Sequence, residues 1–147
     1  MTAPDPAVLS TRLAVMHDLL VYLDGLGEVT GDRLRSDMGL RLAVERALCQ
    51  LVDQAVDINA HLAARSLGRA PQTQRESFEL AVRGGWLPDD LHDALIGSAG
   101  MRNVLVHDYV SVDLDVVAAA VPLAIRHYRT YVTAIARALI GEGRSSE

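Results

Sequence analysis

The residues best equipped for chemistry gather in one short stretch that contains Arg102, Asn103, His107 and Tyr109. Histidine titrates near neutral pH and can exchange protons with a reacting group. The guanidinium of arginine can bind a phosphate or another anion through two parallel hydrogen bonds. We therefore take this stretch as the candidate site for chemistry.

The spacing of these residues restricts how they can act together on a helix. Asn103 and His107 are four positions apart and share one face. Arg102 and His107 are five positions apart, so an ideal helix directs them to different sides. Two explanations remain open: the helix loosens near Val106, or the groups act across an interface between two molecules.

Each of these residues also has a structural interpretation. His107 could stabilise the end of a helix, where a positive imidazolium is favourable. Asn103 could bond only to its own helix, and Tyr109 could fill the core with a hydrogen-bonded tip. The small residues 97–100 before the motif predict a place where another backbone approaches closely.

Helical periodicity positions this stretch in an all-α domain. We expect a first helix between the prolines at 4 and 6 and the glycines at 25 and 27, then helices over about 36–66, 74–83, 88–106 and 113–140. Pro122 should kink the last one. The prediction is a single up-and-down four-helix bundle with an extra short helix over 1–140, followed by a flexible tail over 141–147.

The first helix has two apolar faces. Leucines and a methionine form one face, and a second face is formed by Val15, Leu19, Tyr22 and Leu26. A helix that is apolar on two sides lies centrally or contacts a second subunit. The pattern leaves both possibilities open, and the second of them would make the protein a homodimer.

Composition excludes several classes of function. The formal net charge is −5, and all 14 basic residues are arginines, so there is no Walker-type phosphate loop. An acidic chain disfavours general binding to long nucleic acid, and no DNA partner is expected. Cys49 is the single cysteine, which excludes a disulfide and a cysteine-based zinc site. No signal peptide or membrane span is predicted, so we expect a cytoplasmic protein.

The motif resembles that of the HEPN superfamily, and of its HepT-type toxins in particular. Those toxins have an Arg, a polar residue after it, a His after four to six intervening residues, and a Tyr two residues further on. Arg102, Asn103, His107 and Tyr109 match that order. The segments 42–61, 77–80 and 85–87 also look like HepT, and the resemblance covers roughly residues 1–140.

The resemblance implies a metal-independent endoribonuclease without a cofactor. RNA can be cleaved by its own 2′-hydroxyl, so His107 would be the acid/base and Arg102 the phosphate clamp. Asn103 would position one of them, in a cleft between two protomers. Arg102 is the single base between residues 84 and 118, so other arginines should support RNA binding. Candidates are Arg46, Arg65, Arg126 and Arg129.

The resemblance also implies a partner, a nucleotidyltransferase antitoxin of the MntA type. Such antitoxins transfer AMP to the motif tyrosine, which here is Tyr109, and the added charge should exclude RNA. An alternative is a non-catalytic helical dimer that serves as partner of a nucleotidyltransferase. Asp57 and His61, four positions apart, could share a metal. No third ligand is evident, so no metal site is expected.

Overall fold

The computed structural model describes residues 6–145, apart from the side chains of Tyr109 and of residues 142–145. The described chain is all-helical and contains no strand, which confirms the predicted fold class. Its elements are α1 (Pro6–Gly25), α2 (Gly31–Ser36), α3 (Met38–Leu67), α4 (Gln74–Arg83), η1 (Asp89–Leu91), α5 (His92–His107), η2 (Tyr109–Ser111) and α6 (Leu114–Ser145).

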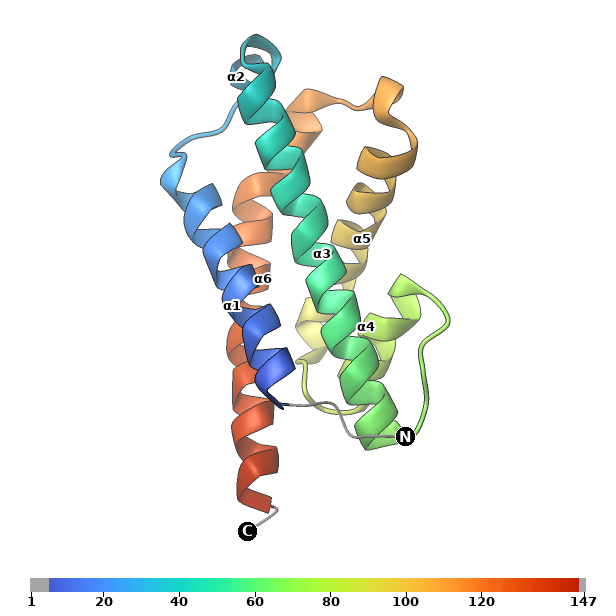
Figure 1. Cartoon of the computed structure of the whole chain (residues 1–147). Helices are drawn as coiled ribbons and strands as arrows, with labels where there is room; N and C mark the ends of the chain where they lie inside the picture. The colour runs from blue at the N-terminus through green and yellow to red at the C-terminus, as the bar shows by residue number, and fades with distance from the viewer. Residues whose placement is uncertain (1–5, 146–147) are drawn as a thin grey trace.

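The four long helices α1, α3, α5 and α6 alternate in direction along the bundle (Figure 1). α4 is the short extra helix and lies beside the lower half of α3 in this view. This arrangement is the predicted up-and-down bundle. It places the C-terminal end of α5 at the same end of the molecule as the start of α3.

One helix was not anticipated. α2 occupies residues where a break was expected, and two N-terminal caps explain it. The side chain of Thr30 accepts a hydrogen bond from the Arg33 amide, and that of Asp37 accepts one from the Leu40 amide. Asp37 has an extended backbone, so it ends one helix and begins the next.

Gly31 lets α2 pack against the start of α6. A Cβ at this position would overlap the carboxylate of Asp115. The Arg35 guanidinium lies 2.6 Å from Asp32 and 3.2 Å from Asp115. The side chains of this cluster are largely exposed, so it orients α2 and contributes little stability.

The core confirms the first apolar stripe of α1. Leu9, Leu13, Met16, Leu20 and Leu23 are all buried. The second face behaves differently: Leu19 and Leu26 are partly buried, whereas Val15 and Tyr22 remain exposed. α1 is therefore a peripheral helix with apolar residues left on its outer surface.

The last helix is longer than predicted. Pro122 lies inside α6 without ending it, and the helix continues to Ser145. The backbone is thus helical through most of the segment 141–147 that was expected to be flexible, and residues 146–147 lie outside the described part. No helix within residues 6–145 is long and apolar enough to cross a membrane.

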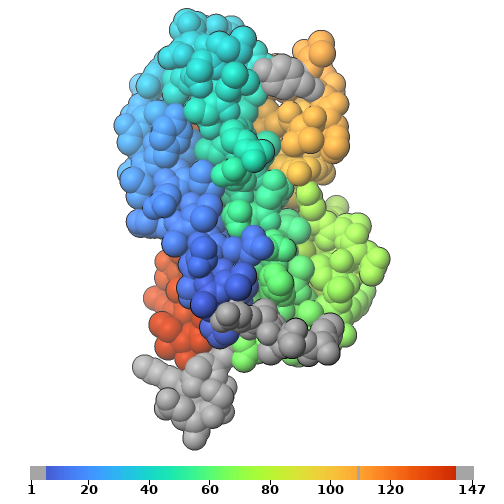
Figure 2. Space-filling view, in the orientation of Figure 1, coloured from blue at the N-terminus to red at the C-terminus, as the bar shows by residue number. Residues whose placement is uncertain are grey.

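α5 and α6 diverge within the bundle. α5 packs mainly on α3 and α4, whereas α6 packs mainly on α1 and α2. α1, α3 and α4, by contrast, pack side by side on the face shown in Figure 2, where they appear in blue, teal and green. The divergence leaves an open groove between α5 and α6 next to the candidate site.

Candidate active site

α5 presents the motif as a regular helix up to its last residue. The Asp108 amide still donates to the Val104 carbonyl at 2.9 Å, and Asp108 then leaves the helix with φ −128° and ψ 50°. The helix therefore does not loosen before His107. Arg102 and His107 project about 140° apart around its axis.

Arg102 is fixed by a residue on another helix. Its Nε donates a hydrogen bond of 2.9 Å to Oδ1 of Asp53 on α3. Its Nη1 lies 3.5 Å from Oδ1 of Asn103. The side chain is 22% exposed, so it is held at the edge of the core. The remaining N–H groups of the guanidinium stay available for an anion.

Asp53 was missed by the sequence reasoning. It follows the buried Val52 on α3 and carries no motif of its own. Its pairing with Arg102 depends on how α3 and α5 are rotated against each other, which periodicity does not specify.

The α3 side of the site also contains Arg46 and Cys49. Cys49 is buried, as expected, and burial raises the pKa of its thiol, while the nearby positive charges of Arg102 and Arg46 oppose that rise. Arg46, Cys49 and Asp53 recur at helical spacing and lie on one face of α3. Arg46 is exposed beside Gln50, and it is the predicted RNA-binding arginine that shares a neighbourhood with Arg102.

The other predicted RNA-binding arginines are spread over the molecule. Arg65 lies near the far end of α3, about 18 Å along the helix from Asp53. Arg126 and Arg129 are exposed on α6, and Arg129 forms an ion pair of 3.0 Å with Asp24 on α1. These three do not line the groove beside Arg102.

His107 and Asn103 are exposed on the outer face of α5. His107 makes no hydrogen bond or ion pair within the part of the chain that the structure describes, so its ring is free to reach a substrate. It is also the last residue of α5, which keeps the helix-end interpretation compatible with its position. Tyr109 begins η2 two residues later, and its side chain lies outside the described residues.

Asp57 and His61 lie on another side of α3. Nη2 of Arg12 on α1 lies 2.5 Å from Oδ2 of Asp57 in an ion pair, and Nε2 of His61 lies 3.8 Å from the same oxygen. No three His, Cys, Asp or Glu side chains among the described residues are grouped so that they could hold a metal ion. The Arg12–Asp57 ion pair is an interhelical contact between α1 and α3, whereas Asp57 and His61 lie one turn apart on α3.

The groove between α5 and α6 has a volume of about 400 Å³ and a mostly apolar lining. Arg102 stands at its edge, with Gly97, Ser98 and Met101 on the same helix. Leu123 of α6 lines it and is 47% exposed. Beneath it, Tyr128 is buried and its hydroxyl lies 2.6 Å from that of Ser98. The groove is a preformed apolar surface that reaches Arg102 of the candidate motif.

These features define a class of protein. A helical bundle that holds an arginine on a carboxylate, with an exposed histidine at the end of the same helix, has the groups needed for acid–base cleavage of a phosphodiester.

Comparison with known proteins agrees with this class. Residues 16–135 match the family model described as ribonuclease HepT-like. A tRNA nuclease HepT of Aphanizomenon flos-aquae is 30% identical over 140 residues, which covers 95% of both chains. An mRNA nuclease HepT of Shewanella oneidensis is 28% identical over 105 residues, covering 71% of this chain and 79% of that one.

Two solved structures share the fold. One is a tri-AMPylated HEPN toxin of Shewanella oneidensis in complex with MNT antitoxin, with a TM-score of 0.79, 23% identity, and coverage of 88% of this chain and 97% of that one. The other is YutE, a cytosolic protein of unknown function from Bacillus subtilis, with a TM-score of 0.83, 18% identity, and coverage of 97% and 95%.

The chain belongs to the ribonuclease HepT-like family. The predicted family, the all-helical HEPN-type fold and the enzyme class, a ribonuclease, are thereby confirmed. The roles of the individual motif residues stay predictions and are developed below.

Proposed function

We propose that this protein is the toxin of a toxin–antitoxin pair and cleaves RNA without a metal, using Arg102 and His107. The observation that carries the proposal is the Asp53–Arg102 bond, which fixes the arginine of the motif helix at Nε and leaves terminal N–H groups for an anion, five positions before an exposed histidine. A purely structural arginine would be paired through its whole guanidinium. Here Asp53 is the one acidic partner of Arg102 among the described residues, and its other contact is the 3.5 Å approach of Nη1 to Asn103.

The chemistry needs only proton transfer and charge stabilisation. The ribose 2′-hydroxyl attacks the adjacent phosphorus, and the bond from phosphorus to the 5′-oxygen of the next nucleotide breaks. His107 accepts the 2′-hydroxyl proton or protonates the leaving 5′-oxygen. Arg102 binds the non-bridging oxygens, where negative charge builds up. The products are a 2′,3′-cyclic phosphate and a free 5′-hydroxyl.

Two copies of the chain form the complete site in this proposal. Arg102 and His107 point in different directions on one helix. A single phosphate therefore cannot contact both side chains of the same α5 at once. The groove between α5 and α6 is apolar, open and continuous with Arg102. A second copy packed into it would cover exposed Leu123 and Val116 and bring a second motif to the same cleft.

Arg46 extends the site for RNA. It is the candidate arginine on the α3 face that carries Asp53, and it makes no contact with an acidic residue among the described side chains. It would bind a phosphate next to the one that is cleaved. Asn103, 3.5 Å from Arg102, would limit rotation of the guanidinium.

A nucleotidyltransferase antitoxin would silence the enzyme at Tyr109. The phenolic oxygen of Tyr109 attacks the α-phosphorus of ATP, pyrophosphate leaves, and the phenolic proton passes to a base of the antitoxin. The AMP group adds negative charge two residues from His107. It would compete with RNA for Arg102.

Analysis of the cleavage products tests this proposal. Purified protein is incubated with RNA in the presence of a chelator, and tRNA is the first substrate to try because the tRNA nuclease relative aligns over 95% of the chain. We expect cleavage with a 2′,3′-cyclic phosphate end. A substrate with a 2′-deoxy sugar at the mapped cleavage site should resist. Cleavage of that modified substrate would refute 2′-hydroxyl attack.

A further inference from the structure

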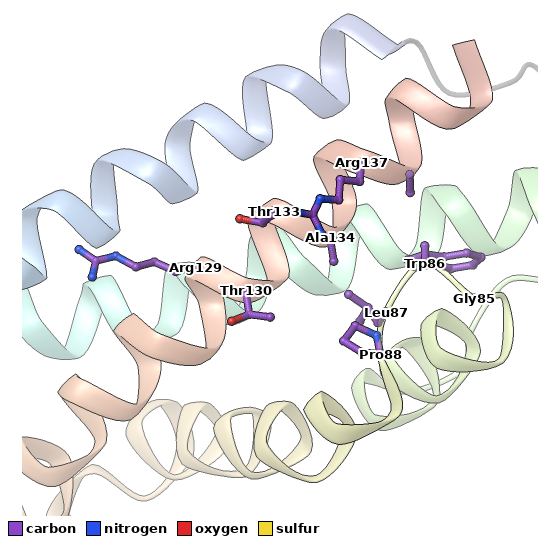
Figure 3. A pocket seen from close by; sticks show the side chains of 10 residues that line it. Gly85, Trp86, Leu87, Pro88, Arg129, Thr130, Thr133, Ala134 and Arg137 are labelled. Carbon is purple, nitrogen blue, oxygen red and sulfur yellow. The ribbon is translucent and has the colours of Figure 1, made fainter. Parts of the chain in front are cut away.

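A second cavity, of about 690 Å³, lies between the C-terminal half of α6 and the chain that joins α4 to η1 (Figure 3). Arg129, Thr130, Thr133 and Arg137 line it from α6, and residues 85–88 line it from the other side. α5 begins at His92, shortly after the residues 85–88 that line the cavity, and Arg102 lies ten positions and about 15 Å further along that helix. The cavity is therefore separate from the catalytic motif.

The wall formed by residues 85–88 is apolar and rigid. Trp86 is 8% exposed and packs on Gly84, where a Cβ would overlap the indole ring. Gly85 has a φ of +84°, a conformation that favours glycine. The Leu87 amide donates to the Ala81 carbonyl at the end of α4. This wall is formed before any ligand binds.

The α6 wall is basic. From residue 116 to residue 141 the chain carries Arg126, Arg129 and Arg137 and no acidic residue, although the whole protein has a net charge of −5. Arg137 is exposed and has no ion pair within the described residues. Asp89 and Asp90 follow Pro88 but do not line the cavity, so the formal charges of its lining are all positive.

Arg129 can join Arg137 at a ligand. Figure 3 shows its side chain extended toward α1, in line with its 3.0 Å ion pair to Asp24. Both partners of that pair are more than half exposed, so the pair is weak and a phosphate can replace the carboxylate. The two arginines are eight residues apart on one helix, about 12 Å along its axis. A few nucleotides of RNA span that length.

We propose that this cavity, defined by Arg129, Arg137 and the wall of residues 85–88, is a second RNA-binding site. Successive phosphates of the RNA backbone lie on Arg129 and Arg137, and one sugar or base lies against the apolar wall. This inference rests on the proposed ribonuclease function and adds a substrate class to it. A folded RNA can reach both the cavity and the catalytic cleft. A short single strand that binds in the catalytic cleft does not extend to the cavity.

Binding measurements with two RNA probes test the site. A tRNA pool and a single-stranded RNA of about ten nucleotides are titrated into His107→Ala protein to keep the RNA intact, with and without Arg137→Glu. The matched control is Arg75→Glu, the same charge change at an exposed arginine of α4 that does not line the cavity. We expect Arg137→Glu to weaken tRNA binding about 10-fold and the short strand less than 2-fold. The salt dependence of tRNA binding should fall by about one phosphate contact.

The outcomes separate this site from the proposed enzymatic function. Equal tRNA affinity for Arg137→Glu and Arg75→Glu would overturn the second site, while cleavage by wild-type protein would leave the ribonuclease intact. Equal losses on tRNA and on the short strand would also overturn it, because the two probes would then share one site. If Arg137→Glu weakens tRNA binding while wild-type protein cleaves no RNA, the second binding site is supported and the ribonuclease proposal is refuted. If the variant instead weakens only the complex with the nucleotidyltransferase, the cavity binds protein and the inference is wrong.

Discussion

Oδ1 of Asp53 lies 2.9 Å from Nε of Arg102, and this contact joins α3 to the motif helix α5. The side chains of Asp53 and Arg102 are 41% and 22% exposed, so water screens the pair and its contribution to stability is small. Its geometric effect is larger. A guanidinium held at Nε directs its two terminal nitrogens toward the same side, the arrangement that binds two oxygens of one phosphate.

Substitutions of Asp53 should therefore affect activity more than stability. Asp53→Ala frees Arg102 to rotate, and we expect kcat/KM for RNA to fall about 10-fold with a change in Tm of only a few degrees. Asp53→Asn keeps an oxygen that accepts the Nε–H bond, so it should recover part of the loss. Steady-state cleavage assays and thermal melts measure both effects. Full activity of Asp53→Ala would show that the contact does not orient the arginine.

The groove between α5 and α6 should mediate self-association. Leu123→Glu places a charge on its apolar lining, and we expect the molar mass measured by light scattering to shift from dimer to monomer. RNA cleavage should fall with it, because the cleft needs two copies. Leu67→Glu is the control, since Leu67 is similarly exposed at the end of α3, outside the groove. A wild-type protein that is already monomeric and active would contradict the shared cleft.

Tyr109→Phe should keep the ribonuclease activity and abolish its inactivation by the nucleotidyltransferase. The variant lacks the phenolic oxygen that would accept AMP, so we expect it to cleave RNA in the presence of the nucleotidyltransferase and ATP, while wild-type protein is inactivated. Intact-mass spectrometry reports the added AMP directly. Tyr22→Phe, at an exposed tyrosine of α1, should be modified and inhibited like the wild type. AMP on the Tyr109→Phe protein would place the modification elsewhere.

Two buried tyrosines should make the fold sensitive to alkaline pH. Burial raises the pKa of Tyr128 and Tyr131, whose hydroxyls contact Ser98 and Asn59. In the unfolded chain both ionise near pH 10. The unfolded state therefore binds fewer protons above that pH, and the free energy of unfolding should fall as pH rises from about 10.

Denaturant titrations across this range check the sign and size of the effect. Each tyrosine that stays protonated in the fold contributes a slope of up to about 1.4 kcal/mol per pH unit. Tyr128→Phe should reduce the slope, at a loss of about 1 kcal/mol at neutral pH from its hydrogen bond to Ser98. A slope identical to that of wild type would mean that Tyr128 ionises equally in both states.

Periodicity was sufficient to predict most of the fold, because the buried stripe of α1 and the boundaries of α4 follow from side-chain spacing and from stop signals. It missed α2, since two caps seven residues apart, Thr30 and Asp37, make a helix too short to show a period. It overestimated the burial of α1, where Val15 and Tyr22 face outward. Asp53 escaped detection because its role arises from the packing of two helices that are distant in sequence.

The motif itself was visible because it breaks the apolar pattern of its helix. What the sequence left open was whether α5 loosens before His107, and the regular bond from Asp108 to Val104 excludes that explanation. Supporting arginines were harder to select. Arg65, Arg126 and Arg129 were chosen from the charge of their segments. None of them lines the groove beside Arg102, whereas Arg129 lines the second cavity, so their part in RNA binding stays a prediction.

The most direct test of the central claim is cleavage of RNA by wild-type and His107→Ala protein in the presence of a metal chelator. His17→Ala, at an exposed histidine of α1, is the control for loss of an imidazole. We predict that wild type and His17→Ala cleave at equal rates, and that His107→Ala is slower by about 100-fold or more with an unchanged fold. The same products at the same rate from His107→Ala would contradict the account.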